Sequence, residues 1–298
     1  MSKILVFGGT RFFGKELIKE LIINGHDITI ATRGIRKDNF GDKVKRILVD
    51  KRDENALIRA LDGQKYDVVY DTISYSPNDG MRMCNVLRGK TDKYIVVSSV
   101  AVYDKGVNLK ETEFNPSKYK IVMGEREEFS YSEGKRLMEA VLYKNAEFPV
   151  IAVRFPVVIG KDDYTERLLT YVKRVDNKES ICSTKLDSHM NLITQNEAGV
   201  FLAWLLNKDI NAPVNAACIG DISLREMINI IEEECGIEAI LNKEYDDNDT
   251  SPYNNYLNLT INIINIMELG GYRFKKIHSE LREIVKYYKS TLKCRSVV

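Results

Sequence analysis

The chain has 298 residues, of which 44% are hydrophobic and 29% are charged, and its formal net charge at pH 7 is +1. These values are typical of a globular protein and exclude a disordered chain, which combines low hydrophobicity with a large net charge. A near-neutral protein has no global field that attracts nucleic acid or an anionic membrane, so neither is expected as a partner.

The first strand-like run, residues 4–7, begins close to the first residue and is followed by glycines. This start leaves no apolar core of a signal peptide, and no later stretch reaches about 20 apolar residues. The 5 cysteines form no Cys-x-x-Cys pair and have no histidine at the spacing of a zinc site. We therefore expect free thiols, no bound metal and a reducing, cytoplasmic location.

Short β-branched runs alternate with segments of helical periodicity through the first half of the chain. This alternation is typical of βαβ units and predicts a parallel sheet. The expected strands cover residues 4–7, 27–31, 44–49, 67–71, 94–98 and 150–155. Helices are expected at residues 15–23, 54–61 and 81–87. The fold class that follows is α/β, a doubly wound parallel sheet of the Rossmann type.

The regular alternation loosens after Phe155, where we expect a smaller C-terminal α/β lobe that binds substrate. The expected elements are helices at 166–175, 197–206, 224–234 and 277–288, a strand at 214–217 and a long loop at 244–258. We expect residues 1–160, completed by 191–220, to form the Rossmann domain. Residues 161–190 and 221–298 then form the smaller substrate-binding lobe.

A glycine-rich turn joins the first expected strand to the first helix, with the sequence Gly-Gly-Thr-Arg-Phe-Phe-Gly at residues 8–14. Backbone N–H groups and a helix N-terminus in this position favour a pyrophosphate, so the turn predicts a dinucleotide site rather than a plain βα turn. Arg11 stands at the middle place of the glycine pattern, where it constrains the backbone and adds a cation. The turn residues expected to contact the cofactor are Gly8, Thr10, Arg11, Phe12, Phe13 and Gly14.

The end of the second expected strand indicates which cofactor is bound. NAD enzymes place an acidic residue there for the ribose hydroxyls, whereas this chain has Arg33. A guanidinium can pair with the 2′-phosphate of NADP, so NADP is favoured over NAD. The alternative is that Arg33 belongs to a solvated basic loop. Asp50, at the end of the third strand, is placed to accept a hydrogen bond from the adenine amino group.

Tyr131 and Lys135 are four residues apart, which places a phenol and an ammonium on one face of a helix. A close ammonium, together with an oxidised nicotinamide, favours the phenolate, so Tyr131 can exchange a proton with a substrate oxygen while hydride moves. Tyr272 and Lys276 have the same spacing but follow no strand end. Ser99, near the end of the fifth expected strand, either holds the reacting oxygen or is an ordinary strand-end cap.

Together these motifs resemble the extended short-chain dehydrogenase/reductase family, particularly its nucleotide-sugar epimerases and dehydratases. The resemblance runs nearly from end to end and includes Ser-Ser-Val-Ala-Val-Tyr at 98–103, Arg-Phe-Pro at 154–156 and the runs at 215–217 and 223–226. It implies that Ser99, Tyr131 and Lys135 form a catalytic triad. The cofactor contacts expected outside the glycine-rich turn, besides Arg33 and Asp50, are Lys51, Thr72, Ser98, Tyr131, Lys135, Phe155 and Val157.

The glycine-rich turn and the Thr-Arg-Gly run at 32–34 look like a divergent branch of that family, which contains chloroplast stem-loop RNA-binding proteins. This keeps an RNA-binding role open as an alternative. Val100 and Ala101 replace the Asp-Glu pair of the family's dehydratases, so 4,6-dehydration is not expected. His189 and Val157 replace an arginine and an asparagine of UDP-galactose 4-epimerases, which weakens that particular assignment.

Two enzymatic mechanisms fit the same residues. A UDP-sugar 4-epimerase-like enzyme retains its cofactor and returns the hydride to the other face of a sugar or nucleotide-sugar, whereas an NADPH-dependent keto-sugar reductase exchanges its cofactor at each turnover. A third alternative is a catalytically silent protein on the same fold that senses nucleotides or binds RNA. The resemblance also allows a homodimer through the helix that bears Tyr131, in which Leu137, Met138, Val141 and Leu142 serve either that interface or the core.

Overall fold

The computed structural model describes residues 1–183, 185–242, 252–253 and 258–295 of the chain. Its centre is a seven-stranded sheet in the order β12-β7-β5-β4-β1-β2-β3, in which every pairing is parallel. The strands are β1 (Lys3–Phe7), β2 (Asp27–Thr32), β3 (Lys45–Leu48), β4 (Val68–Asp71), β5 (Tyr94–Ser99), β7 (Val150–Phe155) and β12 (Val214–Asn215). The parallel sheet predicted from the sequence is confirmed.

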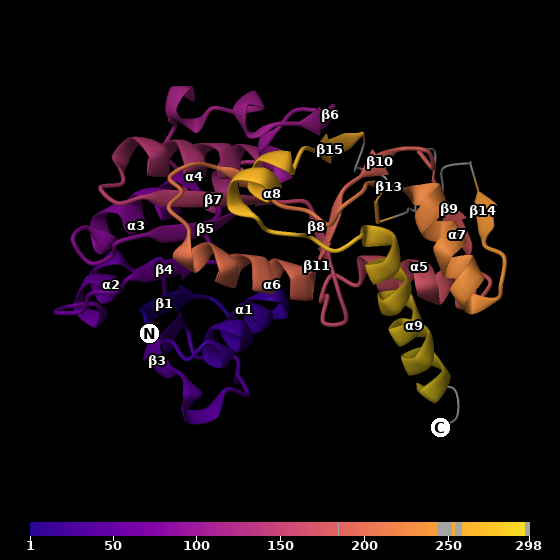
Figure 1. The fold of residues 1–298 in the computed structure, drawn as a ribbon, viewed down its shortest axis with the longest axis horizontal. Coiled ribbons are helices and arrows are strands. Elements are labelled where there is room, and N and C mark those ends of the chain that lie inside the picture. The colour runs from indigo at the N-terminus through magenta and orange to yellow at the C-terminus, as the bar shows by residue number, and fades with distance from the viewer. Residues whose placement is uncertain (184, 243–251, 254–257, 296–298) are drawn as a thin grey trace.

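Helices cover both faces of this sheet (Figure 1). One face carries α1 (Phe12–Ile23) and α6 (Gln195–Trp204), which pack on each other, and the other carries α2 (Glu54–Ala60), α3 (Pro77–Leu87) and α4 (Tyr131–Asn145). Successive side chains of a strand point to opposite faces, so each face has its own cluster of buried apolar residues. The doubly wound arrangement predicted from the sequence is therefore confirmed.

The strand order reverses beside β1, because β2 and β3 extend the sheet on one side while β4, β5 and β7 extend it on the other. In doubly wound sheets such a reversal opens a crevice at the carboxyl ends of the strands, where ligands bind. The glycine-rich turn follows β1, Thr72 follows β4 and Ser99 ends β5. The topology therefore brings three segments that are distant in sequence to one edge of the sheet.

The remaining elements gather mostly at one end of the molecule, where the C-terminus also lies (Figure 1). The helices of this end are α5 (Arg167–Asp176), α7 (Leu224–Cys235) and α9 (Ile277–Arg295), and α8 (Ile264–Gly270) precedes α9. Most of these elements come from residues 161–190 and 221–298, and the domain boundaries themselves stay a prediction.

The helices of the described part of the chain are too short or too polar to cross a membrane.

Three small sheets accompany these helices. Two are parallel pairs, β8 (Val157–Ile159) with β11 (Leu192–Thr194) and β9 (Ser180–Cys182) with β14 (Ile240–Asn242). The third has the order β13-β10-β15-β6 and is formed by β13 (Ile222–Ser223), β10 (His189–Met190), β15 (Leu259–Ile261) and β6 (Gly106–Leu109). The sequence did not predict these eight short strands.

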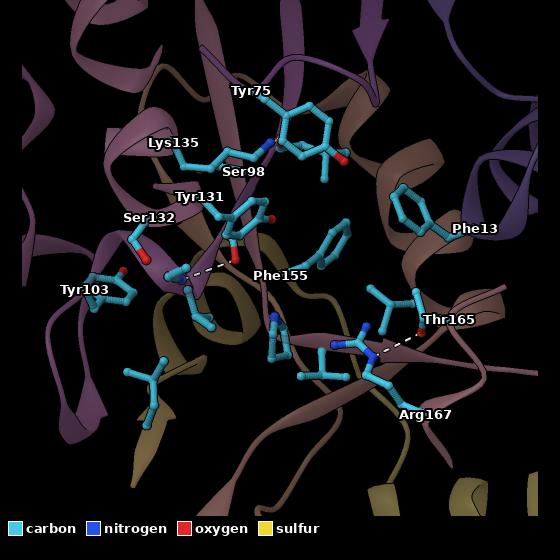
Figure 2. A pocket seen from close by; sticks show the side chains of 18 of the residues that line it. Phe13, Tyr75, Ser98, Tyr103, Tyr131, Ser132, Lys135, Phe155, Thr165 and Arg167 are labelled. Carbon is cyan, nitrogen blue, oxygen red and sulfur yellow. Dashed lines mark hydrogen bonds between the residues drawn. The ribbon is translucent and has the colours of Figure 1, made fainter. Parts of the chain in front are cut away.

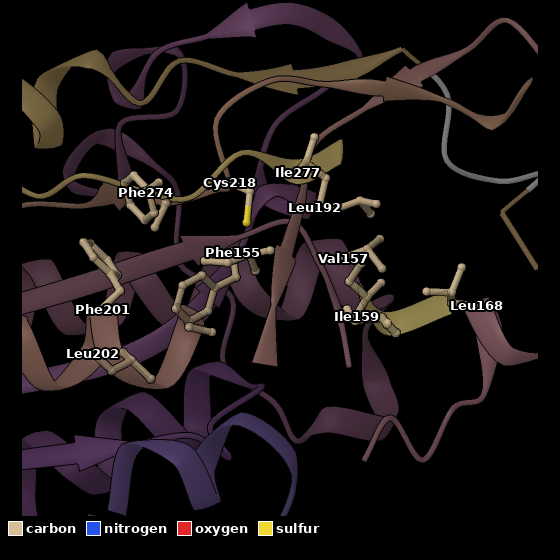
Figure 3. Packing of buried hydrophobic residues seen from close by; sticks show 14 of the residues in the cluster. Phe155, Val157, Ile159, Leu168, Leu192, Phe201, Leu202, Cys218, Phe274 and Ile277 are labelled. Carbon is tan, nitrogen blue, oxygen red and sulfur yellow. The ribbon is translucent and has the colours of Figure 1, made fainter. Parts of the chain in front are cut away.

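The hydrophobic core is continuous between the central sheet and the C-terminal end. After β7 the chain runs into β8, and the buried side chains of Phe155, Val157 and Ile159 belong to one cluster with Phe201 of α6 and Leu168 of α5 (Figure 3). This shared core holds the central sheet and the C-terminal end of the molecule together. Side chains from both parts can therefore face a common cavity.

The apolar face of α4 is part of this single-chain core. Leu137, Met138, Val141 and Leu142 are at most 1% exposed, because α4 packs on α3 and on the sheet. Of the two roles expected for these side chains, the core role is the one observed. A homodimer through α4 would need other residues and stays a prediction.

Three of the long helices differ clearly from the predictions. α9 begins at Ile277 as predicted but continues to Arg295 instead of ending at residue 288. α1 begins at Phe12, directly in the glycine-rich turn, instead of at residue 15. α3 begins at Pro77, because the Ser76 side chain accepts from the Asp79 N–H while the Asp79 carboxylate accepts from the Ser76 N–H, a capping box. Most of the loop expected at residues 244–258 lies outside the described residues.

Candidate active site

The glycine-rich turn between β1 and α1 has a backbone that requires glycine. Gly8 has a φ of +93°, and a Cβ atom on it would lie 2.2 Å from Thr72 Oγ1. Gly14, in the first turn of α1, approaches Gly9 so closely that a Cβ atom would lie 2.9 Å from the Gly9 Cα. The turn brings bare backbone and a helix N-terminus to the sheet edge, and such a cradle fits the pyrophosphate of a dinucleotide.

Arg11 and Phe12 contact the loop that follows β8. The guanidinium carbon of Arg11 lies 3.9 Å from the centroid of the Tyr164 ring, and Phe12 meets the same ring edge-on at 6.1 Å between centroids. Phe12 has a φ of +48°, an uncommon and strained conformation for a bulky side chain. Lys15 forms an ion pair with Asp162, with 2.9 Å between Nζ and Oδ2. The glycine-rich turn is thus joined directly to the C-terminal part of the molecule.

A cavity of about 740 Å³ opens beside this turn, between two walls. The predicted site residues that line it are Phe12, Phe13, Thr72, Ser98, Ser99, Tyr131, Lys135, Phe155 and Val157. We call the side formed by Ser99, Tyr131 and Lys135 the strand-side wall. The opposite side, which the sequence did not predict, is the lobe-side wall, formed by Asp163, Tyr164, Thr165 and Arg167. Figure 2 shows Tyr131 and Lys135 on one side of Phe155, and Thr165 and Arg167 on the other.

Thr10, another predicted cofactor residue, lines a different cavity. This second cavity has a volume of about 480 Å³ and lies between α1 and the segment that follows β2. The charged residues that line it are Lys15, Lys19, Lys37, Lys43 and Asp38. A concentration of lysines at this place provides positive charge next to the glycine-rich turn.

Besides Arg11, three predicted cofactor residues have side chains that line neither of these two cavities. Arg33 follows β2 and is exposed. Asp50 is also exposed, and its Oδ1 accepts a hydrogen bond from the Arg52 N–H at 2.9 Å. Lys51 is buried, and its ammonium forms an ion pair with Asp71.

Ser99 and Tyr131 reach the cavity from two different elements. Ser99 ends β5, and its Oγ also accepts from the Ala101 N–H at 3.2 Å, which caps the short 3₁₀ helix Val100–Val102. Tyr131 is the first residue of α4, and its side chain is about half exposed at 51%. Ser99 therefore has the capping role and also lines the cavity, and Tyr131 is open to a ligand that enters the cavity.

Lys135 lies one helical turn after Tyr131 and is only 2% exposed. Its ammonium donates to the carbonyl oxygens of Ser74 at 2.6 Å and of Val97 at 2.8 Å. The Nζ atom is 4.3 Å from the centroid of the Tyr75 ring and 5.9 Å from that of Tyr131. Burial lowers the pKa of Lys135 to about 7, although the charge of Asp71 opposes the shift. The ammonium is thus held close to the Tyr131 phenol.

Asp71 organises a buried polar cluster behind Lys135. Its carboxylate pairs with the Lys51 ammonium and accepts from Ser74 Oγ at 2.9 Å and from the Tyr94 hydroxyl at 2.7 Å. Burial alone would raise the pKa of Asp71, but the charge of Lys51 and the hydrogen bonds from Lys51 and Tyr94 hold it below its usual value. The cluster fixes Ser74, whose carbonyl holds Lys135.

A second buried ion pair, between Glu139 and Arg154, supports the strand-side wall. Both side chains are 0% exposed, with 2.6 Å between Oε2 and Nη2. Ser98 Oγ donates to Glu139 Oε1 at 2.5 Å, and Arg154 donates to the Tyr103 hydroxyl at 2.9 Å. Sequence reasoning gave Glu139 no role, and its only signal is that it lies one further turn along α4 from Lys135.

Two other residues that the sequence singled out lie away from the cavity. Tyr272 lies between α8 and α9 and is buried, and its hydroxyl donates to Oε1 of Glu197 in α6 at 2.8 Å. His189, in β10, lies 2.8 Å from Asp221 Oδ1 through its Nδ1 and is not part of the cavity wall among the described residues. The pair Tyr272–Lys276 is therefore separate from the candidate site.

The fold and the site together define a Rossmann protein with a dinucleotide-type turn and with Ser99, Tyr131 and Lys135 on one cavity wall. Residues 4–191 match the model of the NAD dependent epimerase/dehydratase family, and the chain belongs to this family. The family indicated by the sequence motifs is confirmed.

Solved structures share this fold over nearly the whole chain. The UDP-glucose 4-epimerase of Thermotoga maritima with UDP-glucose is 16% identical, with a TM-score of 0.74 over 97% of this chain and 99% of that chain. The dTDP-glucose 4,6-dehydratase of Bacillus anthracis in complex with NAD is 15% identical, with a TM-score of 0.74 over 97% of each chain. At these identities the likeness shows the fold alone.

A curated relative is similar over a shorter stretch. The chloroplast stem-loop binding protein of 41 kDa b from Arabidopsis thaliana is 32% identical over 117 residues. That stretch is 35% of this chain and 31% of the relative, so the match spans about a third of the relative's length. The similarity agrees with the divergent branch that the glycine-rich turn indicates.

Proposed function

We propose that the chain is an NAD(P)-dependent enzyme that acts on a hydroxyl-bearing carbon of a sugar or nucleotide-sugar, in the manner of a UDP-sugar 4-epimerase. The observation that carries this proposal is that Ser99, Tyr131 and Lys135 line the same cavity, beside the glycine-rich turn. Membership of the NAD dependent epimerase/dehydratase family and the fold shared with nucleotide-sugar enzymes support it.

The residues of the strand-side wall can manage the proton and the substrate oxygen. Tyr131 takes the proton from the substrate hydroxyl, or returns it, because the Lys135 ammonium close by favours the phenolate. Ser99 Oγ donates to the same substrate oxygen and orients it. Bound NAD(P) supplies hydride transfer at the nicotinamide. Phe155 and Val157 line the cavity between the walls and exclude water from the reacting carbon.

The charges near the glycine-rich turn favour NADP over NAD in this proposal. Arg33 is exposed after β2, and Lys37 and Lys43 line the second cavity beside Thr10. These cations can reach a 2′-phosphate, whereas an acidic residue for free ribose hydroxyls is missing from the Thr-Arg-Gly run at 32–34. The alternative, a solvated basic loop, predicts equal affinity for both cofactors.

The cofactor preference bears on the second candidate function, an NADPH-dependent keto-sugar reductase. A reductase must release oxidised cofactor after each turnover, whereas an epimerase retains it. The 2′-phosphate preference that Arg33 suggests is the feature that favours the reductase. The free, buried thiols of Cys84 and Cys218 agree with a reducing compartment such as the cytoplasm for either enzyme.

Calorimetric titration with NAD, NADH, NADP and NADPH tests the proposal, after denaturation has shown whether nucleotide is already bound. Tight, exchangeable NADP(H) is expected for a reductase, and retained NAD for an epimerase. Proton NMR of UDP-glucose and UDP-galactose with the loaded protein then detects interconversion. Failure to bind any of the four nucleotides would contradict the enzyme proposal and favour a silent protein, such as an RNA-binding one.

A further inference from the structure

Asp163 occupies the turn between β8 and α5 and contributes to the lobe-side wall of the main cavity. Its side chain is 6% exposed. One carboxylate oxygen, Oδ1, accepts from the Thr165 N–H at 2.9 Å and from the Thr165 hydroxyl at 2.6 Å. The Asp163 N–H donates to the Gly160 carbonyl at 3.0 Å. The turn itself is therefore satisfied by the backbone and by one of the two carboxylate oxygens.

The other oxygen, Oδ2, is buried and has no hydrogen-bond partner among the described residues. The Tyr288 hydroxyl of α9 donates to the Gly160 carbonyl of the same turn at 2.6 Å. Polar atoms that are buried without a partner are rare in folded proteins, and each calls for an explanation such as a functional role, an ion or an ordered water molecule. An asparagine could cap the same turn through its carbonyl oxygen, so the turn does not explain a second acceptor or the negative charge.

The residues around Asp163 indicate which kind of ligand could bind at Oδ2. Thr165, which holds Oδ1, also accepts from Arg167 Nε at 3.0 Å, so the lobe-side wall forms one hydrogen-bonded chain. Figure 2 shows Thr165 and Arg167 across the cavity from Tyr131 and Ser132. A carboxylate and a guanidinium in one wall suit a ligand that carries both a hydrogen-bond donor and an anionic group.

We propose that Asp163 Oδ2 accepts a hydrogen bond from a sugar hydroxyl of the substrate and so selects a polyhydroxylated ligand at the lobe-side wall. The assignment rests on the proposed function, since the reacting carbon then lies between this oxygen and the strand-side wall. A hydroxyl bound to a carboxylate makes a short, charge-assisted hydrogen bond, which discriminates strongly against an analogue that lacks the hydroxyl. A nucleobase N–H is the other donor that could reach the same oxygen.

Asp163→Asn is the decisive substitution. The asparagine carbonyl oxygen can still accept from Thr165 as Oδ1 does, while an NH₂ group, which donates, takes the place of the acceptor Oδ2. Asp162→Asn is the matched control, since Asp162 pairs with Lys15 at the surface. Calorimetry of the NAD-loaded proteins with UDP-glucose and with UDP separates the two possible donors. We expect UDP-glucose to bind about tenfold or more weakly to Asp163→Asn, with UDP affinity unchanged and the control like the parent.

Thermal unfolding of the cofactor-free proteins provides a readout that needs no ligand. Asp163→Asn removes a buried charge, so its Tm is expected to equal or exceed that of the parent. A clear fall in Tm would assign Asp163 a structural role and overturn the proposal. If the affinities for UDP and for UDP-glucose fall equally, the donor belongs to the nucleotide, and the sugar assignment is overturned.

The remaining outcomes separate this proposal from the proposed function. If Asp163→Asn binds UDP-glucose as tightly as the parent does, the role of Asp163 is wrong while the nucleotide-sugar function stands. If the parent binds NAD but neither UDP-glucose nor UDP, both the nucleotide-sugar class and the Asp163 assignment are overturned.

Discussion

The two walls of the main cavity are built in different ways. Tyr131 and Lys135 project from a long helix that packs on the central sheet, and buried charges lie behind them. Asp163 and Arg167 come from a short turn and the first residue of α5, and the Arg11–Tyr164 contact connects this wall to the glycine-rich turn. Groups that must keep a fixed geometry lie on the rigid scaffold, whereas a loop can vary to suit a substrate. Under the two proposals made above, the first wall carries out the chemistry and the second selects the substrate.

The largest expected effect tests whether the chemistry lies on the strand-side wall. Tyr131→Phe removes only the hydroxyl that would exchange the proton, so we expect turnover to fall by about 10² to 10⁴-fold with cofactor affinity unchanged. Steady-state kinetics and calorimetry measure the two quantities. Tyr272→Phe is the control, because Tyr272 has the same spacing to a lysine but donates to Glu197 away from the cavity. Unchanged turnover in Tyr131→Phe would remove this residue from the mechanism.

The second prediction concerns the buried charges behind the strand-side wall. Arg154→Met leaves the Glu139 carboxylate buried without its partner, and we expect a loss of about 3–5 kcal/mol in the free energy of unfolding. Arg52→Met breaks the ion pair of Arg52 with Glu127, whose side chains are 56% and 64% exposed, and should cost less than about 1 kcal/mol. Urea denaturation compares both variants with the parent. Similar losses in both would show that the Glu139–Arg154 pair does not support this wall.

The same contrast explains which parts of the molecule the sequence could predict. The glycine-rich turn and the Tyr131–Lys135 pair are local patterns, so their spacing was readable and the topology brought them together. Glu139 and Asp71 look like any helical or strand-end acid in a sequence, because only the folded chain shows that they are buried against Arg154 and Lys51. Local patterns therefore revealed the groups that we propose to react, while the long-range pairings were not visible in the sequence.

The lobe-side wall escaped prediction for a related reason. The Oδ1 atom of Asp163 accepts hydrogen bonds within its turn, whereas Oδ2 does not, and residue spacing in the sequence cannot show that difference. The lysines of the second cavity are likewise spread between α1 and the segment after β2, and they meet only in the fold. The lobe-side wall and the second cavity could therefore be recognised only in the folded structure.

A third prediction uses pH to test the burial of Lys135. Its pKa is about 7 in the folded chain, against 10.5 for an ordinary lysine, so between these values the unfolded chain binds more protons. Stability contributed by this residue therefore rises with pH through that window and is constant below it. In urea denaturation from about pH 6 to pH 10, the free energy of unfolding of the parent should rise relative to that of Lys135→Met as the pH rises. Lys144→Met, an exposed position on the same helix, should keep a constant difference from the parent.

The smallest expected effect lies where the two walls meet, at the contact between Arg11 and Tyr164. The guanidinium stacks on the ring at 3.9 Å, but Tyr164 is 58% exposed, so water weakens the attraction. A double-mutant cycle of Arg11→Ala and Tyr164→Ala should give a coupling of about 0.5–1 kcal/mol in the free energy of unfolding. If Arg11 serves the cofactor instead, the coupling vanishes and Arg11→Ala alone weakens NADP binding. The cycle therefore decides whether the residue that replaces a glycine in the turn connects the walls or binds the dinucleotide.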